Sequence, residues 1–104
     1  MATVRIAATH DIPEGTGQTF EVQGRKIAVF NVGGSFYALD DACSHAEASL
    51  GAGELDSDER CIECPRHGAL FDLETGQPRT LPAYEPVAVY PVRVEEGGIV
   101  VEVP

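Results

Sequence analysis

The sequence predicts an all-β protein, folded as a small antiparallel sandwich or incomplete barrel. Short runs rich in β-branched and aromatic residues recur from end to end, separated by glycine, proline, aspartate and asparagine. Apolar residues with helical spacing are hard to find. The chain has 104 residues, and domains most often contain about 100 to 150 residues. We therefore expect residues 1–104 to form a single domain with one core.

Ten runs are expected to form strands. The N-terminal five are Thr3–Ala7, Thr19–Val22, Lys26–Val32, Ser35–Asp40 and Gly53–Leu55, and the C-terminal five are Arg60–Glu63, Ala69–Asp72, Val87–Tyr90, Val92–Glu95 and Ile99–Val103. Glycine-containing turns of the hairpin type join several of them, at Gln23-Gly24, Gly33-Gly34, Glu74-Thr75-Gly76 and Glu96-Gly97-Gly98. Two stretches, 41–53 and 76–86, are too long for hairpin turns and are predicted to be functional loops.

Composition limits the partners and the compartment. Seventeen acidic residues against seven basic ones give a formal net charge of -10, which disfavours nucleic acid and anionic membrane surfaces and favours a partner with a basic patch. No apolar run reaches the roughly 18 to 20 residues of a membrane span, and the N-terminus lacks the apolar stretch of a secretory signal. These features predict a soluble, cytoplasmic protein.

Two Cys/His pairs are the candidate functional residues. Cys43-Ser44-His45 lies in the first long loop, and Cys64-Pro65-Arg66-His67-Gly68 follows a short predicted hairpin. Three cysteines without a signal sequence favour metal binding over disulfides. Three interpretations remain open on these residues alone: a structural zinc site, a chance arrangement, and a [2Fe-2S] cluster with two Cys on one iron and two His on the other.

The spacing resembles a known family. The pattern C-x-H, eighteen intervening residues, then C-P-x-H-G resembles the Rieske iron-sulfur motif, and the resemblance extends through Phe71–Gly76 and Leu81-Pro82-Ala83 to Tyr90–Glu95. The chain looks like the Rieske-type [2Fe-2S] ferredoxin of bacterial aromatic-ring-hydroxylating dioxygenase systems. The resemblance implies that Cys43 and Cys64 bind the inner iron and that His45 and His67 bind the outer, more exposed iron.

The same resemblance implies a division of the domain and a function. A cluster-binding subdomain, about 41–80, would be inserted into a base formed by the flanking strands. The protein would carry single electrons from a flavin-containing, NAD(P)H-dependent ferredoxin reductase to a terminal oxygenase, through weak, transient and electrostatically assisted docking. The chain shows no general acid/base pair or nucleophile, so it is not expected to be an enzyme itself. The alternatives are the small Rieske subunit of an assimilatory nitrite reductase and, more remotely, a zinc-stabilised binding module.

Residues near the motif predict a low reduction potential. High-potential Rieske proteins carry Ser and Tyr hydroxyls that donate to cluster sulfurs, and Ala69 and Phe71 occupy those positions here. They also carry a disulfide between the two ligand loops, whereas the corresponding residues here are Ala48 and Arg66. We therefore expect a potential near the bottom of the Rieske range, roughly -150 to +300 mV.

The other cysteine, the other histidine, one proline-containing segment and a group of acidic residues are not expected to bind the metal. Cys61 is expected to be an inert core residue and His10 a solvated loop residue. The segment Leu81-Pro82-Ala83 is expected to cover the cluster, as in the family. Eight acidic residues between positions 40 and 63 are expected to be either a solvated face or a steering surface for partners: Asp40, Asp41, Glu47, Glu54, Asp56, Asp58, Glu59 and Glu63.

Overall fold

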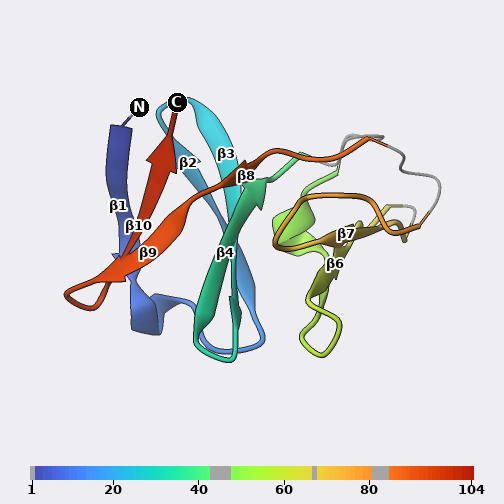
Figure 1. Cartoon of the computed structure of the whole chain (residues 1–104), viewed down its shortest axis with the longest axis horizontal. Coiled ribbons are helices and arrows are strands. Elements are labelled where there is room, and N and C mark those ends of the chain that lie inside the picture. Colours follow the sequence, from blue (N-terminus) through green and yellow to red (C-terminus); the bar gives the residue numbers. More distant parts are fainter. Residues whose placement is uncertain (1, 43–47, 67, 81–84) are drawn as a thin grey trace.

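Ten strands and two short 3₁₀-helices form the described part of the chain (Figure 1). The computed structural model describes residues 2–42, 48–66, 68–80 and 85–104. The elements in chain order are β1 (Ala2–Ala8), η1 (Thr9–Asp11), β2 (Gly17–Val22), β3 (Arg25–Val32), β4 (Ser35–Asp40), η2 (Leu50–Ala52), β5 (Glu54–Asp56), β6 (Cys61–Glu63), β7 (Leu70–Asp72), β8 (Val89–Tyr90), β9 (Val92–Glu95) and β10 (Gly98–Val103). Each of the ten predicted strands overlaps one of these, which confirms the all-β prediction.

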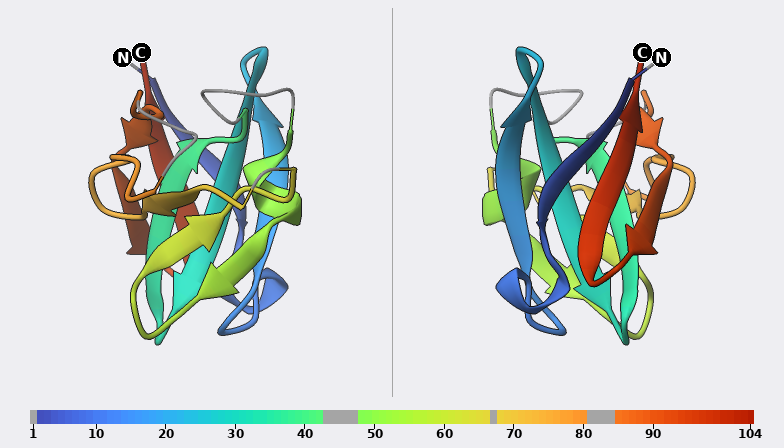
Figure 2. Two further views of the ribbon diagram at one scale, coloured as in Figure 1. Left: turned by 90° about the vertical axis from the view of Figure 1, so that its right-hand side faces the viewer. Right: turned by 90° about the vertical axis from the view of Figure 1, so that its left-hand side faces the viewer.

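The strands form three antiparallel sheets that are stacked as layers. The basal sheet has the order β1-β10-β9, the central sheet β2-β3-β4-β8, and the distal sheet β5-β6-β7. Figure 1 shows the basal sheet on the left, the central sheet in the middle and the distal sheet on the right. In Figure 2 the left-hand view looks onto the distal sheet and the right-hand view onto the basal sheet.

Strand β3 is buried on both faces because the central sheet lies between the other two. Side chains alternate along a strand, and Ala28, Phe30 and Val32 accordingly point to one side while Ile27 and Val29 point to the other. All residues from Ile27 to Val32 are buried. This explains the continuous apolar run in β3, which a strand covered on one face only would not need.

The two sides of β3 belong to two separate cores, so the expectation of one core is wrong: a central sheet that is covered on both faces has a core on each face. The basal core, between the central and basal sheets, comprises Ile12, Val22, Ile27, Val29, Ala38, Tyr90, Ile99, Val101 and Val103. The distal core, between the central and distal sheets, comprises Ala28, Phe30, Val32, Leu39, Leu50, Ile62, Cys64, Ala69, Phe71, Leu73 and Val87. Ile62 and Phe71 face each other across the β6–β7 pair and are fully buried. The distal core therefore fastens the small β5-β6-β7 sheet to the rest of the fold.

Three of the four predicted hairpin turns are two-residue turns between paired strands. Their residues have positive φ at both positions: Gln23 (50°) and Gly24 (80°), Gly33 (60°) and Gly34 (91°), and Glu96 (48°) and Gly97 (73°). Positive φ at both positions is the type I′ geometry that matches the twist of antiparallel strands. The fourth turn, at Glu74–Gly76, does not lead into a paired strand. The chain returns beside β7 only as a single bridge between Phe71 and Pro78.

Only β4 and β9 have their predicted bounds. The other eight strands begin or end one or two residues away, and backbone hydrogen bonds explain two of these differences. The run Gly53–Leu55 becomes Glu54–Asp56, because η2 ends with Gly53 as its C-cap, whose N–H donates to the Leu50 carbonyl. The run Val87–Tyr90 shortens to β8 (Val89–Tyr90), which pairs with only Ala38 and Leu39 of β4. The run is shortened at its N-terminal end, where the Val87 N–H donates to the Gly76 carbonyl at 2.9 Å and not to β4.

Candidate metal centre

Cys64 is the one predicted ligand that the described residues include; Cys43, His45 and His67 lie outside them. It follows the last residue of β6 directly, and it is fully buried in the distal core. Among the residues that the structure describes, no three potential ligands of the Cys, His, Asp and Glu type form a cluster. The complete ligand set therefore remains a prediction from the sequence.

The loop that begins at Cys64 is closed by its own backbone. The N–H of Cys64 donates to the carbonyl of Ala69 at 2.8 Å, and the N–H of Gly68 donates to the carbonyl of Cys64 at 2.9 Å. Gly68 has a φ of 73°, which glycine adopts without the steric cost that a Cβ would add. These bonds fix the backbone at both ends of the segment in which position 67 lies.

The flanks of three loops meet in the distal core: the long loop 41–53, the shorter loop that begins at Cys64, and the long loop 76–86. Leu50 and Ala48 belong to the first loop, Cys64 begins the second, and Val87 ends the third. Leu50 is fully buried and Val87 is 6% exposed. The structure thus places the described ends of the segments that carry the predicted ligands against one apolar cluster.

The environment of Cys64 fits a thiolate ligand of a soft metal centre. A thiol at the end of a strand, buried among apolar side chains and next to two loops, can offer sulfur to iron while water is kept away. Cys61 and Cys64 are both free thiols. Within the described residues the donor chemistry is therefore compatible with an iron-sulfur cluster.

Asp41 is a structural residue that the sequence interpretation missed. Its side chain is only 5% exposed, and its Oδ1 accepts hydrogen bonds from Thr19 Oγ1 at 2.8 Å, Ser49 Oγ at 2.9 Å and the Gly51 N–H at 2.8 Å. The expectation that Asp41 belongs to a solvated or steering face is therefore wrong. In the sequence, this structural role is indicated only by an acidic residue that follows a predicted strand and precedes Ser49-Leu50-Gly51.

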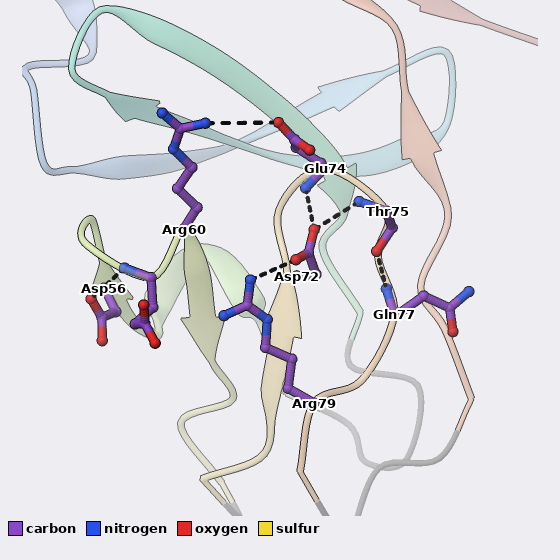
Figure 3. Close-up of polar contacts among 8 residues, drawn as sticks. Asp56, Arg60, Asp72, Glu74, Thr75, Gln77 and Arg79 are labelled. Atoms are coloured by element: carbon purple, nitrogen blue, oxygen red, sulfur yellow. Dashed lines mark hydrogen bonds and ion pairs between the residues drawn. The ribbon is translucent and has the colours of Figure 1, made fainter.

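Asp72 organises the turn after β7 (Figure 3). Its Oδ1 accepts from the N–H groups of Glu74 at 2.9 Å and Thr75 at 3.0 Å, and its Oδ2 accepts from the Arg79 guanidinium at 2.6 Å. The Arg79 hydrogen bond is the main reason that the pKa of Asp72 lies below its usual range, and the Thr75 and Glu74 N–H groups act in the same direction. The Arg79 N–H in turn donates to the Leu70 carbonyl at 2.7 Å.

Comparison with known proteins identifies the family. The model of the Rieske [2Fe-2S] domain matches residues 2–91. The chain belongs to the Rieske [2Fe-2S] family. It is 47% identical over 94 residues to the 3-phenylpropionate/cinnamic acid dioxygenase ferredoxin subunit of Shigella flexneri serotype 5b (strain 8401), which covers 90% of this chain and 87% of the relative.

Two solved structures resemble this Rieske domain over nearly its full length. The ferredoxin of carbazole 1,9a-dioxygenase from Nocardioides aromaticivorans IC177 is 39% identical, with a TM-score of 0.94 over 97% of both chains. A chain in the complex of reduced oxygenase and oxidized ferredoxin of carbazole 1,9a-dioxygenase is also 39% identical, with a TM-score of 0.89 over 95% of this chain and 91% of that one. The Rieske fold predicted from the sequence is thereby confirmed.

Cys61 and His10 lie in the surroundings that the sequence predicts for them. In this Rieske domain Cys61 lies in β6 and is 1% exposed, and burial raises the pKa of its thiol despite the opposing effect of Arg79. The side chain of His10 is 85% exposed. Glu47 and Leu81-Pro82-Ala83 lie outside the described residues. No helix in residues 2–42, 48–66, 68–80 and 85–104 is long and apolar enough to cross a membrane.

The Asp72–Arg79 pair predicts an acid-dependent contribution to stability. Because the pKa of Asp72 is lowered in the folded Rieske domain, its contribution is complete above the unfolded-state pKa, about 3.9, and is lost as the pH falls through the folded-state pKa. We expect Asp72→Asn to lower the free energy of unfolding by about 1 kcal/mol at pH 7, because the pair is partly exposed, and by less near pH 3.

Urea unfolding followed by circular dichroism at pH 7 and at pH 3 measures this difference. If the bound cluster is released at pH 3, wild type and Asp72→Asn both lose it, so the comparison between them still holds. Glu95→Gln is the control, because Glu95 pairs with Arg93 on the surface and both side chains are about half exposed. An Asp72→Asn deficit as large at pH 3 as at pH 7 would contradict the assigned pKa shift.

Proposed function

We propose that this protein is the ferredoxin of an aromatic-ring-hydroxylating dioxygenase system, which carries one electron at a time and catalyses no reaction itself. The 47% identity with a dioxygenase ferredoxin subunit over 90% of the chain carries this assignment. Relatives with this name are electron-transfer components of multicomponent oxygenases. The all-β fold supports the proposal, because a single small domain provides a rigid mount for a redox centre and leaves catalysis to a partner.

We further propose that the cluster is bound by Cys43, His45, Cys64 and His67. The bound cluster would supply a reversible one-electron couple, whose potential neutral imidazole ligands raise above that of an all-cysteine cluster. Cys64 would hold the inner iron from within the distal core, together with Cys43. The hydrogen bonds of Cys64 with Gly68 and Ala69, which hold the described ends of the second ligand loop together, support this assignment. The subdomain that carries these residues is proposed to be about 41–80, which contains the whole distal sheet.

The partners follow from the same assignment. Electrons would arrive from a flavin-containing, NAD(P)H-dependent ferredoxin reductase and leave to a terminal oxygenase, and the known complex of a similar ferredoxin with its oxygenase supports the second step. Such redox encounters bury little surface and are short-lived. We place the protein in the cytoplasm, where the reductase finds its NAD(P)H.

The proposal is tested by spectroscopy on freshly purified protein. A red-brown oxidised protein that bleaches with dithionite and then gives the rhombic EPR signal of a His-ligated cluster supports it. A redox titration of the same sample should give a midpoint in the lower part of the range of roughly -150 to +300 mV, since Ala69 and Phe71 are fully buried without hydroxyl groups to donate to sulfur. A colourless protein holding one zinc would instead establish a binding module, and stable co-purification with a siroheme subunit would establish a nitrite reductase.

Mutation can test separately whether the acidic β5–β6 turn steers the reductase toward this protein. Asp56, Asp58 and Glu59 are exposed in this turn, which lies at the end of β6 opposite Cys64 and so acts through its field rather than by direct contact with the ligand loops. We expect neutralisation of all three to slow electron transfer with the reductase about threefold at low salt and to have little effect at 0.5 M salt, where charges are screened beyond a few ångströms.

Stopped-flow reduction by the reductase at several ionic strengths measures the effect. Asp56→Asn keeps the oxygen that accepts the Glu59 N–H at 3.1 Å, so the turn is preserved. The control neutralises Glu14, Glu95 and Glu96, which are exposed and belong to other turns, and changes the net charge equally. Equal slowing in both triple variants would show that net charge, and not this turn, steers the partner.

A further inference from the structure

The first ligand loop is closed at its base by a set of hydrogen bonds around Asp41. Ala42 and Ser49 form an isolated antiparallel bridge, and the Leu50 N–H donates to the Asp41 carbonyl at 2.7 Å. The Asp41 N–H donates to the Lys26 carbonyl of β3 at 3.0 Å. We call Asp41, Ala42, Ser49, Leu50 and Gly51 the neck. Between its two sides the chain passes through positions 43 and 45, where the proposed function places two ligands.

The Asp41 side chain ties this neck to the central sheet. One carboxylate oxygen accepts from Ser49 and Gly51, which lie on the returning side of the neck, and from Thr19, which lies in β2. Hydrogen bonds to a buried carboxylate are stronger than those between neutral groups. A carboxylate with three donors on one oxygen therefore has a fixed position, and it fixes the donors in turn.

The neck is closely packed at Gly51. A Cβ added at Gly51 would overlap Thr19 Oγ1 and would lie 3.0 Å from Asp41 Oδ1. Leu50, between Ser49 and Gly51, is fully buried and belongs to the same distal core as Cys64. A shift of the neck would thus disturb both the polar contacts with β2 and the apolar contacts near the second ligand loop.

We propose that Asp41, held by Thr19 and Ser49, is a positioning residue that fixes the neck of the first ligand loop and thereby determines how firmly the cluster is retained. This inference rests on the proposed function, because it takes Cys43 and His45 as ligands. Asp41 itself binds no iron in this proposal. It acts through the backbone on either side of the ligand loop.

The test measures cluster release from the oxidised holoprotein, as loss of visible absorbance in excess chelator. Asp41→Ala should release the cluster on the order of tenfold faster, because it removes three hydrogen bonds to a charged acceptor. Asp41→Asn retains an oxygen in the same place and should stay within about threefold of wild type. Hydrogen exchange at the Leu50 and Gly51 amides should accelerate in Asp41→Ala and return toward the wild-type rate in Asp41→Asn.

Two further variants separate positioning from general stability. Thr19→Val combined with Ser49→Ala removes two of the three donors without touching Asp41, and it decides the question if Asp41→Ala does not fold. Ile99→Val destabilises the basal core, far from the neck in the fold, by about 1 kcal/mol, and should not accelerate release beyond its effect on global unfolding.

The proposal is overturned if the neck variants release the cluster no faster than Ile99→Val, or if Asp41→Asn is as fast as Asp41→Ala. Failure of the proposed function looks different, since wild-type protein would then lack the visible bands before any variant is compared.

Discussion

Cys64→Ser is expected to yield a folded protein without the visible absorption bands of the cluster and without electron-transfer activity. Serine keeps the size of the side chain, but its hydroxyl is not ionised at neutral pH and is a poor ligand for iron in a sulfur-ligated site. Cys64 is fully buried directly after the end of β6. A side chain from the surface therefore cannot easily take its place as a ligand. We expect the bound iron to fall at least tenfold, measured by iron analysis and absorbance.

Cys61 offers a matched control three residues away. It lies in β6, which ends just before Cys64, and it is likewise buried. Burial raises the pKa of its thiol, so the thiol stays protonated at neutral pH. Cys61→Ala should therefore keep the cluster and lose only about 1 kcal/mol of stability from the reduced packing. Retention of iron by Cys64→Ser, or its loss from Cys61→Ala, would contradict the proposed ligand assignment.

Gly76→Ala is expected to cause the largest loss of stability among single substitutions of turn glycines, because Gly76 is buried. Gly76 has a φ of 75°, and a Cβ there would overlap the carbonyl oxygen of Val87. The Val87 N–H donates to the Gly76 carbonyl at 2.9 Å. The overlap would therefore push apart the two ends of the loop 76–86. Left-handed strain of about 1 kcal/mol and overpacking of about 2 kcal/mol predict a total near 3 kcal/mol in urea unfolding.

Gly97 separates these two contributions. Its φ of 73° is nearly the same, but a Cβ there would meet no atom within 4 Å. Gly97→Ala should therefore cost only the backbone strain, about 1 kcal/mol. Equal losses of stability in the two variants would show that the close approach between Gly76 and Val87 is not a determinant of the fold.

Strands and turns could be predicted from the sequence because their causes are local. Alternation of apolar residues and the Gly-containing pairs at 23–24, 33–34 and 96–97 each act within a few residues, and the structure confirms them. The family resemblance also depends on short motifs around Cys43 and Cys64. Nothing in the described residues tests the roles of Cys43, His45 and His67, which remain predictions.

Contacts between distant segments could not be predicted in the same way. The role of Asp41 depends on Thr19, which lies 22 residues earlier in the chain, and in the sequence Asp41 looks like one more member of an acidic group. Asp40 is a second example, because its Oδ1 accepts from the Tyr90 hydroxyl at 3.0 Å. Side-chain hydrogen bonds of this kind become visible only when tertiary structure brings their partners together.

The position of β10 in the middle of the basal sheet has a consequence for the order of folding. β10 pairs with both β1 and β9, and Ala2 lies opposite Val103. β1 therefore has no partner in this sheet until the last residues of the chain arrive. The β2-β3-β4 and β5-β6-β7 meanders, in contrast, consist of neighbouring strands whose closure requires only short loops. We therefore expect the β1-β10-β9 sheet, which joins the first strand to the last, to form in the final step of folding. The β5-β6-β7 sheet next to Cys64 can form before it.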